Sequence, residues 1–362
     1  MAATTRQTKD LGVRRLLSRL SRWYCLIGVF CLTAIGTAFT LMLNYSEPND
    51  LLQLKLHITR ATTPSDNQLR RSLEEIVCNS RHWSINRTQI AELRNSLARH
   101  MNNRQPFLTQ ENTPIGRKYF NTYLQLPMQI DKSKRTLLPE TSPFAYNAGV
   151  KTCAVVGNGG ILKNSGCGND IDRSELVFRT NLPILSGFAD DAGRRSNLTS
   201  ISPSTVSLQK VNKHGDFNKS RALSVFTEYN GYLVWVPNSW WVSHNMAFKV
   251  SELVHKNTKL KLLLSDPEYS RKFGDFWQFG RQILSSGMTM ISIALSVCEE
   301  IHAYGFWPFP VNSEGDALPM HYAEDLSWST YNNTHDYRTE FDLLTKLHHQ
   351  GVLKLHIEKC SD

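Results

Sequence analysis

Two histidines of this 362-residue chain lie at short spacings from carboxylates, where they could carry acid–base chemistry. His321 lies three residues before Glu324, and His335 lies five residues before Glu340. An imidazole exchanges a proton near neutral pH, so either ring could serve as a general acid or a general base. The H-E-x-x-H spacing of zinc proteases is absent, which argues against a zinc centre of that kind. A surface histidine without a catalytic role is the alternative for each ring.

A glycine-rich turn follows the apolar run 153–156, which we predict to be a buried strand. The turn, residues 157–160 (Gly-Asn-Gly-Gly), lets the backbone approach a ligand closely, as a phosphate-binding loop does. The dinucleotide fingerprint G-x-G-x-x-G is not met, because Leu162 stands at its last glycine position. A strand-to-helix turn that binds no ligand is therefore the alternative.

An aromatic segment and two acidic pairs are further candidates for a site. Residues 305–309 (Gly-Phe-Trp-Pro-Phe) predict a loop after a strand, where a base or a sugar ring can stack, with plain packing as the alternative. The D-x-D spacing of Asp170 and Asp172 looks like that of metal-dependent glycosyltransferases, and Asp190 and Asp191 form another acidic pair.

The elements that must position these residues alternate between short apolar runs and amphipathic stretches. This alternation predicts an α/β domain with a largely parallel sheet flanked by helices. Ligands of such sheets bind beyond the carboxyl ends of the strands, where the turn 157–160 falls. The predicted strands are 152–156, 176–179, 232–236, 260–264, 303–306 and 352–357, and the predicted helices are 247–256, 267–279, 288–301 and 338–349.

The amino-terminal part predicts a membrane anchor. Residues 23–43 contain no charged side chain and are long enough to cross the hydrocarbon core of a bilayer. Residues 1–22 carry six basic residues and one acid, or +5 of the formal net charge of +9, which places this tail in the cytoplasm. The remaining +4 is too small to indicate nucleic-acid binding. A cleaved signal peptide is the alternative. We predict a stem over 44–105 and one lumenal domain over 106–362.

Cysteines and glycosylation sequons agree with a lumenal domain. Five cysteines follow the predicted span, an odd number that suggests two disulfides and one remaining thiol in an oxidising compartment. The sequons that we predict to be glycosylated lie at Asn86, Asn197, Asn218 and Asn332.

Taken in order, these segments resemble the animal α-2,8-sialyltransferases of glycosyltransferase family 29, over about residues 112–360. The Gly-Asn-Gly-Gly turn and residues 112–116 are most similar to the members that form di- and oligosialyl groups. Residues 153–203 resemble the large sialylmotif, and residues 284–306 resemble the small motif. Residues 321–324 resemble the third motif, and residues 335–340 resemble the very small motif, H-x₄-E.

The resemblance implies a modified Rossmann-like fold (a GT-A variant), CMP-sialic acid as donor and inversion at the anomeric carbon. It implies that His335 is the general base, that His321 lies near the departing phosphate and that Glu340 holds this region in place. No cofactor and no metal are expected, because the D-x-D falls within the large sialylmotif. The implied disulfides are Cys153–Cys298 and Cys167–Cys360, which leave Cys78 for a free thiol or a homodimer bridge. The implied donor-binding residues are Asn158, Asn181, Ser202, Ser204, Ser285, Ser286, Gly287, Trp307 and His321.

Several positions depart from the family pattern around the donor and acceptor sites. Thr180 replaces a cysteine, Ser202 an asparagine, Ser286 a threonine and Ala323 a tyrosine, and residues 336–338 replace a run that contains Met-Pro. The sequence thus predicts a single-pass type II Golgi enzyme that forms an α-2,8 bond to a sialylated glycolipid or glycoprotein. The alternatives are another linkage or acceptor, or a catalytically silent Golgi protein that binds sialoglycans or a partner.

Overall fold

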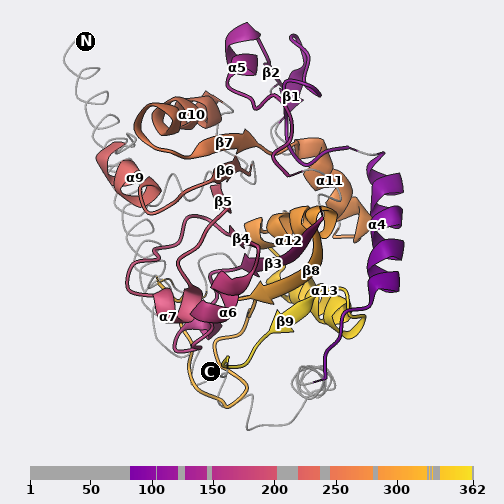
Figure 1. The fold of residues 1–362 in the computed structure, drawn as a ribbon, viewed down its shortest axis with the longest axis vertical. Coiled ribbons are helices and arrows are strands. Elements are labelled where there is room, and N and C mark those ends of the chain that lie inside the picture. Colours follow the sequence, from indigo (N-terminus) through magenta and orange to yellow (C-terminus); the bar gives the residue numbers. More distant parts are fainter. Residues whose placement is uncertain are drawn as a thin grey trace, which may run out of the picture. The chain divides into compact units, whose positions relative to one another are not determined.

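The computed structural model describes residues 82–102, 104–120, 127–144, 149–201, 219–236, 245–279, 284–323, 326, 328 and 335–360, all within the compact unit Gln68–Asp362 (Figure 1). Among these residues no helix is both long and apolar enough to cross a bilayer. The predicted span, Cys78, and the sequons at Asn218 and Asn332 lie outside the described residues.

A parallel sheet of seven strands is the centre of the fold (Figure 1). The chain adds strands β3 to β7 in one direction and then returns to add β8 and β9 beyond β3, so the order is β7-β6-β5-β4-β3-β8-β9. Ligands of parallel sheets bind at such a reversal, which here falls between β3 and β8. The strands are β3 (Val150–Val156), β4 (Leu176–Arg179), β5 (Leu198–Ile201), β6 (Tyr232–Trp235), β7 (Lys261–Leu264), β8 (Cys298–Tyr304) and β9 (Lys354–His356).

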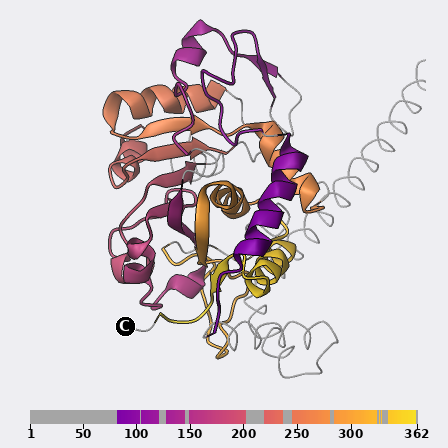
Figure 2. The ribbon, with the colours of Figure 1, turned by 45° about the vertical axis from the view of Figure 1, so that its right-hand side comes forward.

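Helices cover both faces of this sheet (Figure 2). Alternation along β3 explains the two layers, because Cys153 and Val155 join one buried cluster and Ala154 and Val156 another. The first face is covered by α4 (Arg87–Met101), α11 (Pro267–Phe276), α12 (Ser286–Val297) and α13 (Tyr337–His349). The second face is covered by α6 (Gly168–Arg173), α7 (Ala189–Ala192), α9 (Lys219–Phe226) and α10 (Asn245–Asn257). The remaining elements are β1 (Lys118–Phe120), β2 (Pro127–Gln129), α5 (Lys132–Thr136) and η1 (Gly160–Leu162).

The predicted helix 288–301 is wrong at its carboxyl end. Helix α12 ends at Val297, and Cys298–Tyr304 is strand β8, which pairs in parallel with β3. Pairing with β3 gives this segment backbone hydrogen bonds and buries its side chains, and these tertiary contacts outweigh the helical period of the sequence.

Strand β5 was not predicted. All four of its residues are buried, but Thr199 and Ser200 interrupt the apolar run Leu198–Ile201. A strand buried on both faces shows no alternation, and here two polar side chains also remove the continuous apolar signal.

Helix α4 lies in the segment assigned to the stem, and it packs on the core. Ile90, Leu97 and Met101 are buried in the same cluster as α12 and α13. Arg94 Nε donates to the Leu295 carbonyl at the end of α12, at 2.8 Å. Residues 87–101 are therefore part of the compact fold, while the boundary between stem and catalytic domain stays a prediction.

Both implied disulfides are present. Cys153–Cys298 joins β3 to the start of β8, with both cysteines fully buried and their Cα atoms 5.9 Å apart. Cys167–Cys360 joins the start of α6 to the segment after β9, with the Cα atoms 4.9 Å apart.

The two described sequons differ in their surroundings. Asn86 is exposed and caps α4, accepting the Gln89 N–H on its side-chain oxygen at 3.1 Å. Asn197 is half-buried beside β5, and its side-chain oxygen accepts the Val177 N–H at 2.9 Å. Asn86 is thus the better placed of the two to carry a glycan, and glycosylation at either stays a prediction.

Candidate active site

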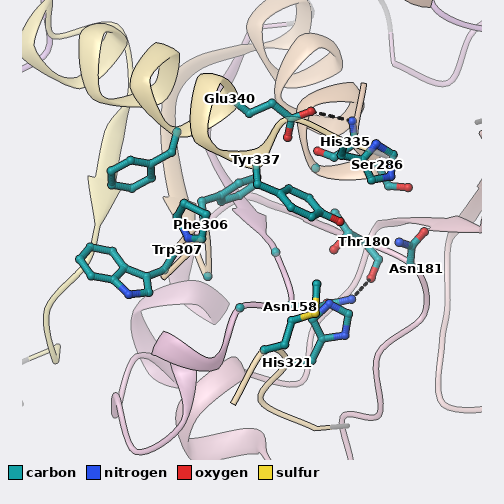
Figure 3. A pocket seen from close by; sticks show the side chains of 18 of the residues that line it. Asn158, Thr180, Asn181, Ser286, Phe306, Trp307, His321, His335, Tyr337 and Glu340 are labelled. Atoms are coloured by element: carbon teal, nitrogen blue, oxygen red, sulfur yellow. Dashed lines mark hydrogen bonds between the residues drawn. The ribbon is translucent and has the colours of Figure 1, made fainter. Parts of the chain in front are cut away.

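A pocket lies where β3 and β8 end, at the reversal of the strand order (Figure 3). The turn after β3, the loop after β8, the start of α12 and the start of α13 meet around it. Its described lining residues are Gly157, Asn158, Gly159, Thr180, Asn181, Ser285, Ser286, Gly287, Gly305, Phe306, Trp307, Pro308, Met320, His321, Trp328, His335, Tyr337, Glu340, Phe341 and Leu344.

The glycine-rich turn after β3 packs against the loop after β8. The Gly157 N–H donates to the Tyr304 carbonyl at 2.8 Å, and the Gly159 N–H donates to the Gly305 carbonyl at 3.0 Å. A Cβ atom on Gly157 or Gly159 would lie 2.6 Å from that Gly305 oxygen. The prediction of a phosphate loop is therefore wrong for these two N–H groups, because the close approach that the glycines permit is between two protein backbones.

Two asparagines lie on one wall of the pocket. Asn158 Nδ2 donates to the Thr180 carbonyl at 3.0 Å, and its Oδ1 is buried without a hydrogen-bond partner. Asn181 adopts a left-handed backbone with φ of 59°, and its N–H donates to Ser200 Oγ at 2.9 Å. The unpaired Asn158 oxygen is an acceptor, so it suits a hydroxyl or an N–H of a ligand rather than a phosphate oxygen.

The amino end of α12 faces the pocket through Ser285, Ser286 and Gly287. Ser285 caps the helix, its Oγ accepting the Met288 N–H at 3.1 Å. The positive end of the helix dipole makes such a terminus favourable for an anion. This helix end is therefore a part of the pocket that is suited to a phosphate.

Glu340 holds this helix end from α13. Its Oε1 accepts the Ser285 N–H at 2.8 Å, and the residue is only 6% exposed (Figure 3). Burial raises the pKa of Glu340 to about 7, although the bonds from Ser285 oppose that rise. Glu340 therefore connects the two helices that bring the serines and His335 to the pocket, as the resemblance implied.

The first turn of α13 fixes the neighbours of His335. Asp336 caps the helix, its Oδ1 accepting the Thr339 N–H at 3.0 Å, and this bond lowers the pKa of Asp336. The ring centroids of His335 and Tyr337 lie 5.4 Å apart. Both side chains therefore line the pocket from the same short segment at the start of α13.

The second histidine comes from the opposite wall. His321 forms an isolated antiparallel bridge with Gly159, and the Tyr322 N–H donates to the Asn158 carbonyl at 3.0 Å. Figure 3 shows His321 beside Asn158, while His335 lies beside Ser286. The pocket thus brings together two imidazoles that stand 14 positions apart in the sequence.

The aromatic residues form a packed side of the pocket. The indole N–H of Trp307 donates to the Val311 carbonyl at 2.8 Å, and the Trp307 ring packs edge-on against Phe309 and Phe341. Trp307 is 6% exposed, so little of its surface is open to a ligand.

The acidic pairs lie outside the pocket and bind the protein itself. Asp172 accepts the backbone N–H groups of Arg194 and Arg195, at 2.8 and 2.9 Å. Asp191 accepts the N–H groups of Asn164 and Gly166, at 2.8 and 3.0 Å. In the described part of the chain, no three residues among His, Cys, Asp and Glu are grouped so as to hold a metal ion.

Most of the residues proposed from the sequence line this one pocket. They are Asn158, Asn181, Ser285, Ser286, Gly287, Trp307, His321 and His335. Ser202 and Ser204 lie outside the described residues. Sequence reasoning assigned no site role to Thr180, Met320, Trp328 or Tyr337. Thr180 and Tyr337 stand at departures from the family pattern, a signal that could have pointed to them.

The fold has a pocket at the strand reversal of a parallel sheet, which is where α/β enzymes commonly bind their substrates. Residues 107–352 match the sequence model of glycosyltransferase family 29 (sialyltransferase), and the chain belongs to this family. Two curated relatives are called alpha-N-acetylneuraminide alpha-2,8-sialyltransferase. The Xenopus tropicalis protein is 34% identical over 77% of this chain and 81% of its own length, and the Bos taurus protein is 32% identical over 70% of this chain and 72% of its own length. A crystal structure of a mammalian sialyltransferase with Gal-beta-1-3GalNAc-ortho-nitrophenol is 22% identical, with a TM-score of 0.49, over 70% of this chain and 91% of that one.

Proposed function

We propose that this protein is an inverting, metal-independent α-2,8-sialyltransferase, which transfers sialic acid from CMP-sialic acid to a sialylated glycolipid or glycoprotein. The observation that carries the proposal is one pocket that is lined by His321, by His335 and by the amino end of α12. The names of the α-2,8-sialyltransferase relatives support the linkage.

The proposed reaction gives His335 the role of general base. The acceptor hydroxyl oxygen attacks the anomeric carbon of the donor, and His335 takes the proton of that hydroxyl. The bond from the anomeric carbon to the phosphate oxygen breaks, and CMP leaves from the opposite face, so the configuration inverts. A base with a pKa near the working pH is best suited to this proton transfer.

The leaving phosphate is proposed to lie between the amino end of α12 and His321. Preorganised N–H donors stabilise charge that develops on a leaving group. Ser285, Ser286 and Gly287 lie at this helix end, and Glu340 keeps it in place through the Ser285 N–H. Asn158 and Asn181 complete the donor site from the other wall, with the Asn158 oxygen accepting from a ribose or base donor.

The protein is proposed to be a single-pass type II protein of the Golgi membrane, anchored by residues 23–43. The disulfides Cys153–Cys298 and Cys167–Cys360 support a lumenal catalytic domain, because disulfides form and persist in oxidising compartments. A homodimer through Cys78 would be consistent with the odd number of lumenal cysteines.

The test is a transfer assay with CMP-sialic acid and a panel of sialylated glycolipids and glycoproteins, followed by linkage analysis of the product. His335→Ala should abolish transfer while CMP binding changes by no more than a few-fold, because the base contacts the acceptor. His255→Ala, at an exposed position on α10, is the matched control and should retain full activity. Near-normal turnover of His335→Ala would remove this residue from its role.

Two further outcomes separate the alternatives. A rate that EDTA abolishes and Mn²⁺ restores would contradict metal independence. CMP binding without turnover of any acceptor would favour a catalytically silent sialoglycan-binding protein.

A further inference from the structure

Tyr337 occupies a position in the pocket that no sequence motif assigned to a substrate. It is half-buried in the first turn of α13, and Figure 3 shows its ring crossing the pocket, with the hydroxyl directed toward Thr180 and Asn181 on the opposite wall. Its ring centroid lies 5.4 Å from that of His335. A substrate whose hydroxyl reaches His335 must therefore pass beside the phenol.

The turn that carries Tyr337 is held at two points. Asp336 accepts from the Thr339 N–H at 3.0 Å and from the Thr339 hydroxyl at 2.7 Å. Glu340 accepts the Ser285 N–H at 2.8 Å. Since both anchors lie within three residues of Tyr337, the phenol is presented from a fixed backbone, as specific recognition requires.

A negatively charged substrate in this pocket needs hydrogen-bond donors from the lining residues. Both substrates in the proposed reaction carry a sialic acid carboxylate. The lining residues that the structure describes include neither lysine nor arginine, and the side-chain donors among them are hydroxyl, amide, indole and imidazole groups. The phenol of Tyr337 is one of these donors, and Figure 3 shows it extending across the pocket.

We propose that Tyr337 contacts substrate directly, its phenol O–H donating a hydrogen bond to the carboxylate of a sialic acid in the pocket. This inference rests on the proposed sialyl transfer. The carboxylate belongs either to the acceptor sugar or to the donor sugar, and these sources share one chemistry. Tyr337 lies in the run 336–338, where the family pattern has Met-Pro, so this O–H donor is a feature of this chain.

The test compares an acceptor sialoside with its carboxyl methyl ester, using wild-type protein and Tyr337→Phe. Because a hydrogen bond to a charged group is worth roughly tenfold or more, esterification should lower wild-type kcat/KM by about that factor. Tyr337→Phe should lower kcat/KM on the free acid by a similar factor. In this variant esterification should lower kcat/KM further by less than about threefold, because the two changes remove the same hydrogen bond. Hydrolysis of CMP-sialic acid without acceptor is the second arm. If Tyr337→Phe lowers only the transfer rate and its sensitivity to the ester, the phenol binds the carboxylate of the acceptor. If it also lowers the rate of donor hydrolysis, the phenol binds the carboxylate of the donor.

Two further variants and the activity of the wild-type protein keep the inference separate from folding and from the proposed function. Tyr232→Phe removes a phenol oxygen at the amino end of β6, away from the pocket, and should behave as wild type. Tyr337→Met is a second variant, which should reproduce the loss of ester discrimination while retaining CMP binding and the thermal midpoint. Ester discrimination and donor hydrolysis that match wild type in both variants would overturn the role of Tyr337. A wild-type protein that neither transfers nor hydrolyses sialic acid would instead overturn the proposed function, and the inference with it.

Discussion

Glu340 gives the sharpest test of how the pocket is built. Its carboxyl is buried, with its Oε1 accepting the Ser285 N–H at 2.8 Å, and burial raises its pKa from 4.5 to about 7. The perturbation is Glu340→Gln, which keeps the volume and the acceptor oxygen but cannot ionise. The variant therefore resembles the protonated residue at every pH.

The magnitude follows from proton linkage. Because the pKa of this acid is raised on folding, the folded state binds the proton more tightly than the unfolded state does. The contribution of the protonated carboxyl to stability is therefore full below pH 4.5 and is lost as the pH rises through about 7. With these two pKa values, ionisation should cost the wild type roughly 2–3 kcal/mol more at pH 8 than at pH 5. Glu340→Gln lacks this cost, so its stability relative to wild type should rise by that amount over the same interval.

The assay is thermal or denaturant unfolding of both proteins at pH 5 and at pH 8. A change of 2–3 kcal/mol corresponds to roughly 4–12 °C in midpoint for a domain of this size. Glu252→Gln, at an exposed position on α10, is the matched control and should follow the wild type. A constant difference between wild type and Glu340→Gln across this range would refute the reasoning, because it would mean that folding does not raise the pKa of this carboxyl.

Three further predictions concern stability. Gly305→Ala should lower the thermal midpoint by several degrees, because φ is 71° and the new Cβ would lie 2.7 Å from the Gly157 oxygen; an unchanged midpoint would contradict this close approach. Replacing both Cys153 and Cys298 by alanine frees a separation of 145 residues and should cost up to about 5 kcal/mol in denaturant unfolding, and no measurable cost would count against the bridge. His348 has a pKa lowered to about 4 by burial, and its Nδ1 accepts the Leu355 N–H at 3.1 Å, so stability should fall as the pH drops from 6.5 toward 4. His348→Gln should flatten that fall, and equal acid sensitivity of the two proteins would exclude His348 as a contributor.

The sequence determined most of the sheet and the composition of the site. The runs at β3, β4, β6 and β7 are apolar and bounded by turns, so local pattern and propensity were sufficient to place them. The motif order also selected eight residues that the structure brings to one pocket.

Tertiary structure alone decided the features that depend on contacts between distant segments. Strand β8 is a strand because it pairs with β3, although its sequence continues the period of α12. The glycine turn uses two of its N–H groups on the loop after β8, a contact that no local pattern encodes. The bond from Ser285 to Glu340 and the direction of the Tyr337 phenol likewise depend on how α12 and α13 pack. Sequence pattern reports which residues prefer burial and local geometry, whereas hydrogen-bond partners across 55 or more positions are fixed only when the chain has folded.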